Sequence, residues 1–251
     1  MKIFDVFCGE GIQGNPCAVI MLTGWPPEHE LAQSARRLKV PVTSFIVSHG
    51  LEHHIRWFSA AGEINLCGHG SLAAGAALLE QSRQKRVTLS SRYGPVTIVK
   101  NANRYQLELP SWKRNNCSIA KEQLGLTIEP LDIFSTRDLV VVLESEGAVK
   151  DYNPNFKKIR KLNQFHAVIL TAMSSTNSYV LRYFAPNIGI LEDIATGSAH
   201  CSIAPYWFDT LKQESLTALQ LSKQGGLFEL AKQDHSKIIL TSLVKERGVY
   251  E

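Results

Sequence analysis

The sequence predicts an α+β protein made of two similar halves. Strand-like runs outnumber helical ones along the chain, and several of them pair as hairpins. A strand–turn–helix pattern in the first half recurs in the second half. The length of 251 residues is sufficient for one large domain or for two smaller ones, each with its own core.

The recurring pattern is an Arg-aromatic-Phe strand that leads to Gly-Ser at the head of a helix. In the first copy Gly70-Ser71 follows Arg56 by fourteen residues, and in the second copy Gly197-Ser198 follows Arg182 by fifteen. Because self-similarity on this scale indicates architecture before function, we interpret it as an internal duplication.

The elements are expected from composition and periodicity. Strands are expected at 2–8, 18–22, 43–48, 54–58, 87–89, 96–99, 105–109, 139–143, 166–170, 179–184, 219–221, 225–231 and 237–240. Helices are expected at 27–38, 72–79, 119–124 and 154–162, and 203–208 is an apolar segment that follows the second Gly-Ser. The polar stretch 112–118 is the expected boundary, which divides the chain into residues 1–115 and 116–251.

The stretch 56–79 carries the strongest chemical signal. Its turn, Leu66–Ser71, contains Gly68 and Gly70, which allow a ligand to approach the backbone, and Ser71 can cap the helix that follows. The first N–H groups of a helix have no internal acceptor and carry a partial positive charge. We therefore expect this turn to bind an anion.

Two side chains on this turn, Cys67 and His69, are candidate proton carriers. If the two halves face each other, two helix N-termini meet at one cleft. Such an arrangement suits a carboxylate-bearing substrate, or a carbanion or enolate formed from it.

Composition argues against several other classes of protein. The net charge of +4 comes from scattered Lys and Arg residues, which does not favour nucleic-acid binding. Five cysteines without a C-x-x-C pair indicate free thiols in a reducing compartment, with neither a disulfide framework nor a zinc site. The sequence begins with a strand and has no apolar run of about 20 residues, so we expect a cytoplasmic protein without a membrane segment.

Two motifs are interpreted as structural. Residues 9–14 spell G-x-G-x-x-G, but Asn15-Pro16 and a strand follow where dinucleotide binding needs a helix. His49, His53 and His54 lie at or beside a hairpin turn and are interpreted as solvated side chains, not as metal ligands.

Four segments resemble the PhzF family of phenazine biosynthesis-like proteins: DVFCGEGIQGNPCAVI, RWFSAAGEINLCGHGSLAAG, RYFAPNIGILEDIATGSAH and QLSKQGGLFEL. The resemblance implies a diaminopimelate-epimerase-like fold, in which each half wraps a mixed, mostly antiparallel sheet around a central helix. It implies an active site between the halves and an isomerase that moves a proton on a small carboxylate-bearing substrate, without cofactor or metal. It also implies a homodimer.

The resemblance assigns Asp193 and His69 to substrate contact or proton handling. It assigns anion-binding backbone to Gly68, Gly70, Gly197 and Ser198, and Ser71 belongs to the same helix entrance. Each position also has a structural interpretation: an acidic residue before a helix, a turn histidine bonded to a carbonyl, or glycines that serve the turn alone.

Cys67 occupies the place where related epimerases and proline racemases hold one catalytic thiol, next to a helix N-terminus that lowers a thiol pKa. The partner thiol of a racemase would fall within 194–197, and no cysteine is there. A mechanism with two thiols is therefore not favoured, and a small buried residue is the alternative interpretation of Cys67.

One position departs from the family. The family carries its catalytic glutamate in a Ser-Glu-Thr-x-Phe-type segment, which here reads Pro41-Val-Thr-Ser-Phe and places Val42 at the glutamate. A general acid–base contributes about 10²–10⁴-fold to a rate, and valine cannot carry a proton. Three hypotheses stay open: an isomerase of another substrate that uses Asp193, His69 or Cys67, a small-acid-binding protein without activity, and a subunit or interaction partner with a degraded cleft.

Overall fold

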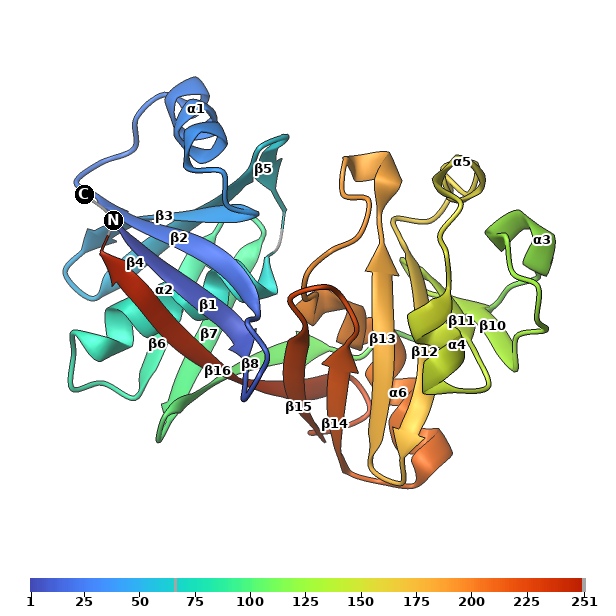
Figure 1. Cartoon of the computed structure of the whole chain (residues 1–251). Coiled ribbons are helices and arrows are strands. Elements are labelled where there is room, and N and C mark those ends of the chain that lie inside the picture. Colours follow the sequence, from blue (N-terminus) through green and yellow to red (C-terminus); the bar gives the residue numbers. More distant parts are fainter. Residues whose placement is uncertain (66, 250–251) are drawn as a thin grey trace. The chain divides into compact units, whose positions relative to one another are not determined.

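Contacts within the chain divide it into two units. The computed structural model, drawn in Figure 1, describes residues 1–65 and 67–249. The first unit comprises Met1–Glu108 and the C-terminal residues from Leu240, and the second comprises Leu109–Ile239. The predicted division at residue 115 treats the halves as consecutive, whereas the last strand returns to the first unit and pairs with the first strand. This pairing joins opposite ends of the sequence, which a local pattern cannot reveal.

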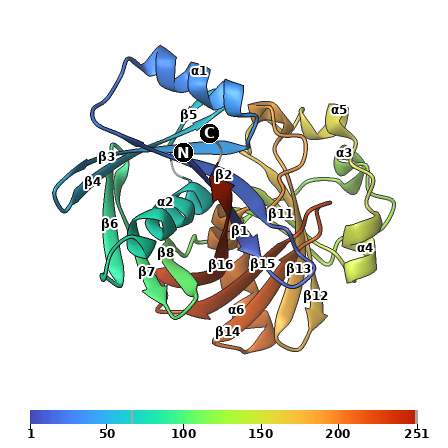
Figure 2. The same ribbon diagram turned by 60° about the vertical axis from the view of Figure 1, so that its left-hand side comes forward.

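The first unit contains the strands expected in the first half and one short strand, β5, that was not expected. Its elements are β1 (Lys2–Cys8), β2 (Asn15–Leu22), α1 (Glu28–Leu38), β3 (Val42–His49), β4 (Glu52–Ser59), β5 (Gly62–Ile64), α2 (Gly68–Glu80), β6 (Arg86–Ser91), β7 (Gly94–Asn101), β8 (Arg104–Pro110) and the end of β16 (Lys237–Val249). The strands are hydrogen-bonded in the order β1-β2-β3-β4-β6-β7-β8-β16, and β16 also pairs with β1, which closes the sheet. Figure 2 shows α2 enclosed by these strands.

Helix α2 can be enclosed because its side chains are small. Its residues from Gly68 to Ala77 are buried, and it contacts β1, β2, β3, β6 and β7. A Cβ atom added to Gly75 would lie 2.6 Å from Cγ2 of Ile98 on β7. The helix therefore lies closer to the sheet than any residue larger than glycine permits at this position.

The G-x-G-x-x-G segment 9–14 is the hairpin turn between β1 and β2. Gly9 and Ile12 exchange two backbone hydrogen bonds of 2.9 and 3.2 Å. Gly14 has a φ of +79°, and a Cβ atom there would lie 2.3 Å from a carbonyl oxygen of β1. A strand follows the motif, as the sequence context predicted, although β2 begins at Asn15 and not at the expected residue 18. The glycines thus serve this turn and its close contact with β1.

The second unit contains most of the remaining elements. These are β9 (Asn115–Asn116), α3 (Lys121–Leu124), β10 (Asp132–Ser135), β11 (Leu139–Val142), α4 (Glu146–Asp151), α5 (Phe156–Ile159), β12 (Val168–Ser175), β13 (Ser178–Phe184), η1 (Pro186–Ile188), η2 (Gly197–Ala199), α6 (His200–Leu211), β14 (Ser215–Gln220) and β15 (Gly226–Lys232).

The two units repeat one order of strand pairings. In the first unit β2 and β3 are parallel across α1, β3 and β4 antiparallel, β4 and β6 parallel across α2, and β6 and β7 antiparallel. In the second unit β11 and β12 are parallel across α4 and α5, β12 and β13 antiparallel, β13 and β14 parallel across α6, and β14 and β15 antiparallel. This agreement confirms the two similar halves, and α6 is the counterpart of α2.

The repeated arginines also make the same interactions. In β4, Arg56 forms two hydrogen bonds with Glu63, of 2.8 and 2.6 Å, and its Cζ lies 5.1 Å from the ring centre of the phenylalanine two positions on. In β13, Arg182 forms two with Glu192, of 2.7 and 2.9 Å, and its Cζ lies 4.9 Å from the equivalent ring. The duplicated sequence pattern therefore corresponds to a duplicated ion pair on an aromatic ring.

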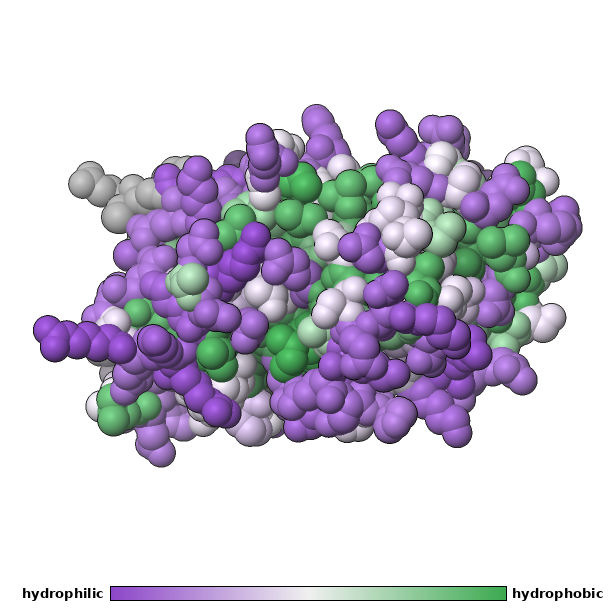
Figure 3. Space-filling model, turned by 90° about the horizontal axis from the view of Figure 1, so that it is seen from below, coloured by the Kyte–Doolittle hydropathy of each residue, from purple (hydrophilic) through white to green (hydrophobic). Residues whose placement is uncertain are grey.

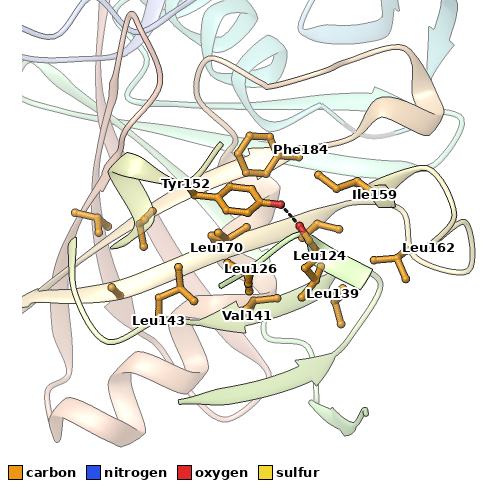
Figure 4. Close-up of a cluster of buried hydrophobic side chains, with 14 residues drawn as sticks. Leu124, Leu126, Leu139, Val141, Leu143, Tyr152, Ile159, Leu162, Leu170 and Phe184 are labelled. Carbon is orange, nitrogen blue, oxygen red and sulfur yellow. Dashed lines mark hydrogen bonds between the residues drawn. The ribbon is translucent and has the colours of Figure 1, made fainter. Parts of the chain in front are cut away.

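Helices cover both faces of the central strands in the second unit. Figure 4 shows the apolar cluster on one face, where the hydroxyl of Tyr152 donates to the Leu124 carbonyl at 2.5 Å. On the other face, Nε1 of Trp207 in α6 donates to Oγ1 of Thr171 in β12 at 2.9 Å. Strand β11 is apolar at every position because both of its faces are covered.

The helices depart from the sequence prediction more than the strands do. Helix α4 was not predicted, although Ser145 caps it by accepting a hydrogen bond from the Ala148 N–H at 3.2 Å. Helix α5 covers only four of the residues expected at 154–162. Short helices gain most of their stability from tertiary packing, here against the cluster of Figure 4, so periodicity locates them poorly.

The surface is mixed in character. On the face shown in Figure 3, hydrophilic side chains predominate and hydrophobic ones form patches among them. Within residues 1–65 and 67–249, no helix is long and apolar enough to cross a membrane.

The contact between Gly75 and Ile98 predicts a stability effect. We expect Gly75→Ala to lower the free energy of unfolding by about 1–3 kcal/mol, since the added methyl group overpacks the interface between α2 and β7. Urea denaturation measures the change. Gly147→Ala in α4 is the control, because its Cβ meets no atom closer than 3.8 Å, and we expect it to be neutral or stabilising by up to about 1 kcal/mol. Equal stability of the Gly75→Ala and wild-type proteins would contradict the close packing.

Candidate functional site

The first group of candidate residues lies at the N-terminus of α2. The helix begins at Gly68, and Cys67 is its N-cap residue, with φ −132° and ψ 102°. The prediction that the helix starts at Leu72 with Ser71 as its cap was wrong, because the thiol of Cys67 accepts the capping hydrogen bond from the N–H three residues on, at 3.4 Å. The Ser71 hydroxyl instead donates to the Cys67 carbonyl at 2.7 Å. Leu66 of the predicted turn lies outside the described residues.

The two predicted proton carriers of this turn are in contact. Sγ of Cys67 lies 3.4 Å from Nδ1 of His69. The imidazole is buried, and its Nε2 atom has no hydrogen-bond partner among the described residues. Burial lowers the pKa of His69 to about 4, so the ring is neutral at physiological pH. This turn therefore holds an uncharged imidazole, one nitrogen of which has no hydrogen-bond partner among the described residues.

The two glycines of this turn differ in the space that their neighbours leave for a side chain. A Cβ atom on Gly70 would lie 2.7 Å from Cδ1 of Trp57 and 2.9 Å from Oγ of Ser44. The Ser44 hydroxyl donates to the Gly70 carbonyl at 2.9 Å, which fixes the helix end against β3. A Cβ atom on Gly68 would meet only Leu107, at an ordinary 3.5 Å. Packing thus explains the glycine at position 70 but not the one at position 68.

The second group of candidate residues lies before α6 in the second unit. Asp193, Gly197 and Ser198 are brought together there by one loop and the short helix η2. Oδ2 of Asp193 accepts a hydrogen bond of 2.5 Å from the hydroxyl of Thr196. The loop is anchored by Gln220, whose side chain accepts from the Thr196 N–H and donates to the Asp193 carbonyl, both at 2.8 Å.

Thr196 is the structural counterpart of Cys67. It is the N-cap residue of η2, with φ −120° and ψ 96°, which nearly equals the backbone conformation of Cys67. A hydroxyl therefore occupies the position in the second unit that a thiol occupies in the first. This agrees with the absence of a cysteine in the segment 194–197.

Sequence reasoning missed two side chains of the second group. Gln220 is fully buried at the end of β14, and nothing in its local pattern distinguishes it from other strand residues. Arg137 contacts the hydroxyl of Ser198 at 3.4 Å and forms an ion pair with the buried Asp138. The sequence signal that could have identified Arg137 is its position beside Asp138, a pair of opposite charges directly before the apolar strand β11.

The histidines of the β3–β4 hairpin make local contacts. His53 shares a hydrogen bond of 2.7 Å with Ser48, and the rings of His49 and His54 meet edge to face at 6.3 Å. In the part of the chain that the structure describes, no three His, Cys, Asp or Glu side chains are grouped so that they could hold a metal ion.

Comparisons with known proteins agree with this architecture. The family model PhzC-PhzF, described as phenazine biosynthesis-like protein, matches residues 4–237. An uncharacterized isomerase of Vibrio cholerae is 48% identical over 249 residues, which are 99% of this chain and 89% of that protein.

Two solved structures extend the comparison. The crystal structure of a phenazine biosynthesis protein of the PhzF family from Enterococcus faecalis is 30% identical, with a TM-score of 0.92, and the match covers 100% of this chain and 98% of that one. A probable proline racemase from Agrobacterium radiobacter has a TM-score of 0.66 at 10% identity, over 99% of this chain and 92% of that one, and shows the shared fold alone. These matches confirm the family resemblance and the expected epimerase-like fold.

Two buried histidines predict how stability depends on pH. Burial lowers the pKa of His69 to about 4 and that of His200 to about 3, both below the ordinary value of 6.5. Below pH 6.5 the unfolded chain therefore binds protons that the folded chain does not bind, and stability falls as the pH falls from about 6.5 toward about 4. Each histidine contributes about 1.4 kcal/mol per pH unit in this window.

Urea denaturation at about pH 7 and about pH 5 measures this slope. We expect His69→Gln and His200→Gln each to reduce the loss of unfolding free energy between the two conditions. Ile98→Ala is the control for general damage to the core, and we expect it to lower stability by a similar amount at both pH values. A slope that neither histidine variant changes would contradict the assignment of neutral buried imidazoles.

Proposed function

The chain belongs to the PhzC-PhzF family of phenazine biosynthesis-like proteins, and we propose that it is an isomerase or epimerase that moves a proton on a small carboxylate-bearing substrate without a cofactor. The observation that carries the proposal is the Nε2 atom of His69, which is buried and has no hydrogen-bond partner among the described residues. A buried polar atom of this kind is costly to the fold, and a bound ligand can satisfy it.

We assign the proton transfer to three side chains. Asp193 is the proposed base, because the hydrogen bond from Thr196 holds its carboxylate in one orientation. His69, with a pKa of about 4, is a weak base, which suits it to hydrogen-bond the substrate or to relay a proton. Cys67 is the further proton carrier, since its thiol lies 3.4 Å from Nδ1 of that imidazole and it is the N-cap residue of α2.

We assign the binding of the substrate carboxylate to the backbone at the two helix entrances. Gly68 and His69 are the first two residues of α2, and N–H groups at these positions have no acceptor inside the helix. The proposed binding residues are Gly68, Gly70, Ser71, Gly197 and Ser198. The meeting of both entrances at one cleft is part of the proposal, as is a homodimer.

Val42 supports a second candidate function. It is the first residue of β3, it is 5% exposed, and it stands where the family resemblance places the catalytic glutamate. The reference reaction of the family is the isomerisation of a dihydro-hydroxyanthranilate. Since valine cannot transfer a proton, this chain lacks the main proton carrier of that reaction. The first candidate is therefore an isomerase of another substrate. The second is a protein that binds small acids and has lost the chemistry.

Hydrogen exchange in deuterated water distinguishes the two candidates. An isomerase incubated with small carboxylic acids exchanges a carbon-bound hydrogen, which mass spectrometry or NMR detects. We expect Asp193→Asn to slow the exchange by about 10²–10⁴-fold, because it removes the general base. A binding protein shows no exchange but is stabilised by the same acids against thermal unfolding.

Asp209→Asn is the matched control. Asp209 lies on α6, its side chain is 75% exposed, and it contacts only Lys232 among the ion pairs of the described residues. We expect this variant to exchange at the wild-type rate. Exchange that survives unchanged in Asp193→Asn, His69→Gln and Cys67→Ser would contradict the proposed carriers.

The position of Val42 predicts a gain of activity. We expect Val42→Glu to accelerate exchange of a dihydro-hydroxyanthranilate by about 10²–10⁴-fold relative to Val42→Gln, because both side chains have the same size and only the glutamate carries a proton. The comparison of the two variants cancels the cost of placing a polar group at a buried position. Equal rates would show that residue 42 does not stand at the glutamate position.

A further inference from the structure

The strongest unassigned feature of the second unit is Arg137, whose guanidinium is hydrogen-bonded to a carboxylate along one edge and has long or missing hydrogen bonds along the other. Nε and Nη2 of Arg137 donate to Oδ1 and Oδ2 of Asp138, each at 3.1 Å. Asp138 is fully buried and its Oδ2 atom also accepts from the hydroxyl of Ser202 in α6, at 3.5 Å. The buried carboxylate thus fixes the guanidinium through two parallel hydrogen bonds.

The face of this guanidinium is fixed as well. Its Cζ atom lies 4.8 Å from the ring centre of Trp112, a distance at which cation and ring attract each other. The main-chain N–H of Trp112 donates to the Cys201 carbonyl of α6 at 2.9 Å, so the ring is tied to the central helix. Together Asp138 and Trp112 determine where the plane of the guanidinium lies.

The outer edge of the guanidinium is only weakly occupied. Nη2 contacts the hydroxyls of Tyr183 and Ser198, both at 3.4 Å, which is longer than an ordinary hydrogen bond. Nη1 makes no hydrogen bond within the described part of the chain, and the side chain is 36% exposed. N–H donors with long or missing partners can donate to an incoming acceptor that lies in the plane of the guanidinium.

Arg182 of the same unit shows what a purely structural arginine looks like here. Its Nε and Nη2 donate to Glu192, and its Nη1 donates to three main-chain carbonyls, of which the shortest contact, to Tyr152, is 2.6 Å. Every nitrogen of that guanidinium is therefore used. Arg137 instead pairs with the buried Asp138 along one edge of its guanidinium, and the donors of the other edge can hydrogen-bond a ligand.

We infer that Arg137, together with the Ser198 hydroxyl, binds a carboxylate group of the substrate. The inference rests on the proposed function, because Ser198 belongs to the helix entrance to which carboxylate binding is assigned. A planar guanidinium with its plane fixed matches the geometry of a carboxylate in two hydrogen bonds. The substrate class is accordingly a small organic acid in its ionised form, and an uncharged amide of the same shape is bound less well.

Binding of benzoate and of its uncharged analogue benzamide tests this inference, with isothermal titration calorimetry or ligand-detected NMR as the measurement. We expect Arg137→Gln to weaken benzoate binding by about 10- to 100-fold, as loss of a charged hydrogen bond does, and to leave benzamide binding unchanged. Arg137→Lys retains the charge without the planar guanidinium, and we expect its benzoate affinity to lie between those of the wild type and Arg137→Gln. Arg160→Gln on the exposed surface beyond α5 is the control, with benzoate binding as in the wild type.

Arg137→Gln leaves Asp138 buried without its cation, which can unfold the protein. The double variant Arg137→Gln with Asp138→Asn removes both charges and keeps two groups that can hydrogen-bond. We expect this variant to fold, as judged by circular dichroism, and to show the same loss of benzoate binding. Benzoate affinity that is equal in the wild type and the double variant, or a wild-type protein that binds benzoate no better than benzamide, would overturn the inference.

The binding measurement is independent of turnover, so the two proposals fail separately. If the protein binds benzoate through Arg137 but exchanges no hydrogen with any acid, the proposed isomerase activity is refuted and the carboxylate-binding role of Arg137 stands. If the protein is active and its KM for its acid is unchanged in the double variant, the carboxylate-binding role of Arg137 is refuted and the proposed isomerase activity stands.

Discussion

The close packing of a small-residue helix inside a closed sheet is the constraint on which the first unit depends. Gly70 and Gly75 stand where the sheet leaves no space for a side chain, against Trp57 and Ile98. The helix can therefore lie deep enough for its first residues to be buried. That depth also shields the polar groups at its N-terminus from water.

Burial then determines the chemistry of the side chains at the starts of the two central helices. His69 and His200 are both neutral at physiological pH because both are buried, which lowers the pKa of each imidazole. His200 shares a hydrogen bond of 2.7 Å with the hydroxyl of Tyr179 and lies among aromatic rings, which gives it a place in the core. His69 contacts a thiol, Cys67, at the helix entrance. Similar burial thus produces a core residue in one unit and a candidate site residue in the other.

The duplication kept the backbone and changed the side chains. Cys67 and Thr196 share an extended N-cap conformation, and each precedes the central helix of its unit. The paired Arg–Glu contacts and the order of strand pairings are also the same in both units. What differs is the chemistry at the helix entrances, with a thiol and an imidazole in one and a carboxylate, a hydroxyl and Arg137 in the other. A repeated scaffold of this kind allows the two helix entrances to carry different side chains.

The sequence by itself determined most of the strands, the duplication, the strand that follows the G-x-G-x-x-G segment and the family, because these depend on local patterns and short motifs. All the predicted site residues lie within two short segments, 67–71 and 193–198, and their function stays a prediction. Only the tertiary structure decided that β16 closes the first sheet, that Cys67 begins α2, and that Gln220 and Arg137 belong beside Asp193 and Ser198. Each of these depends on which backbone or side-chain partners come together on folding. Strand period and composition carry no record of such partners, whereas the folded chain brings them within hydrogen-bond distance.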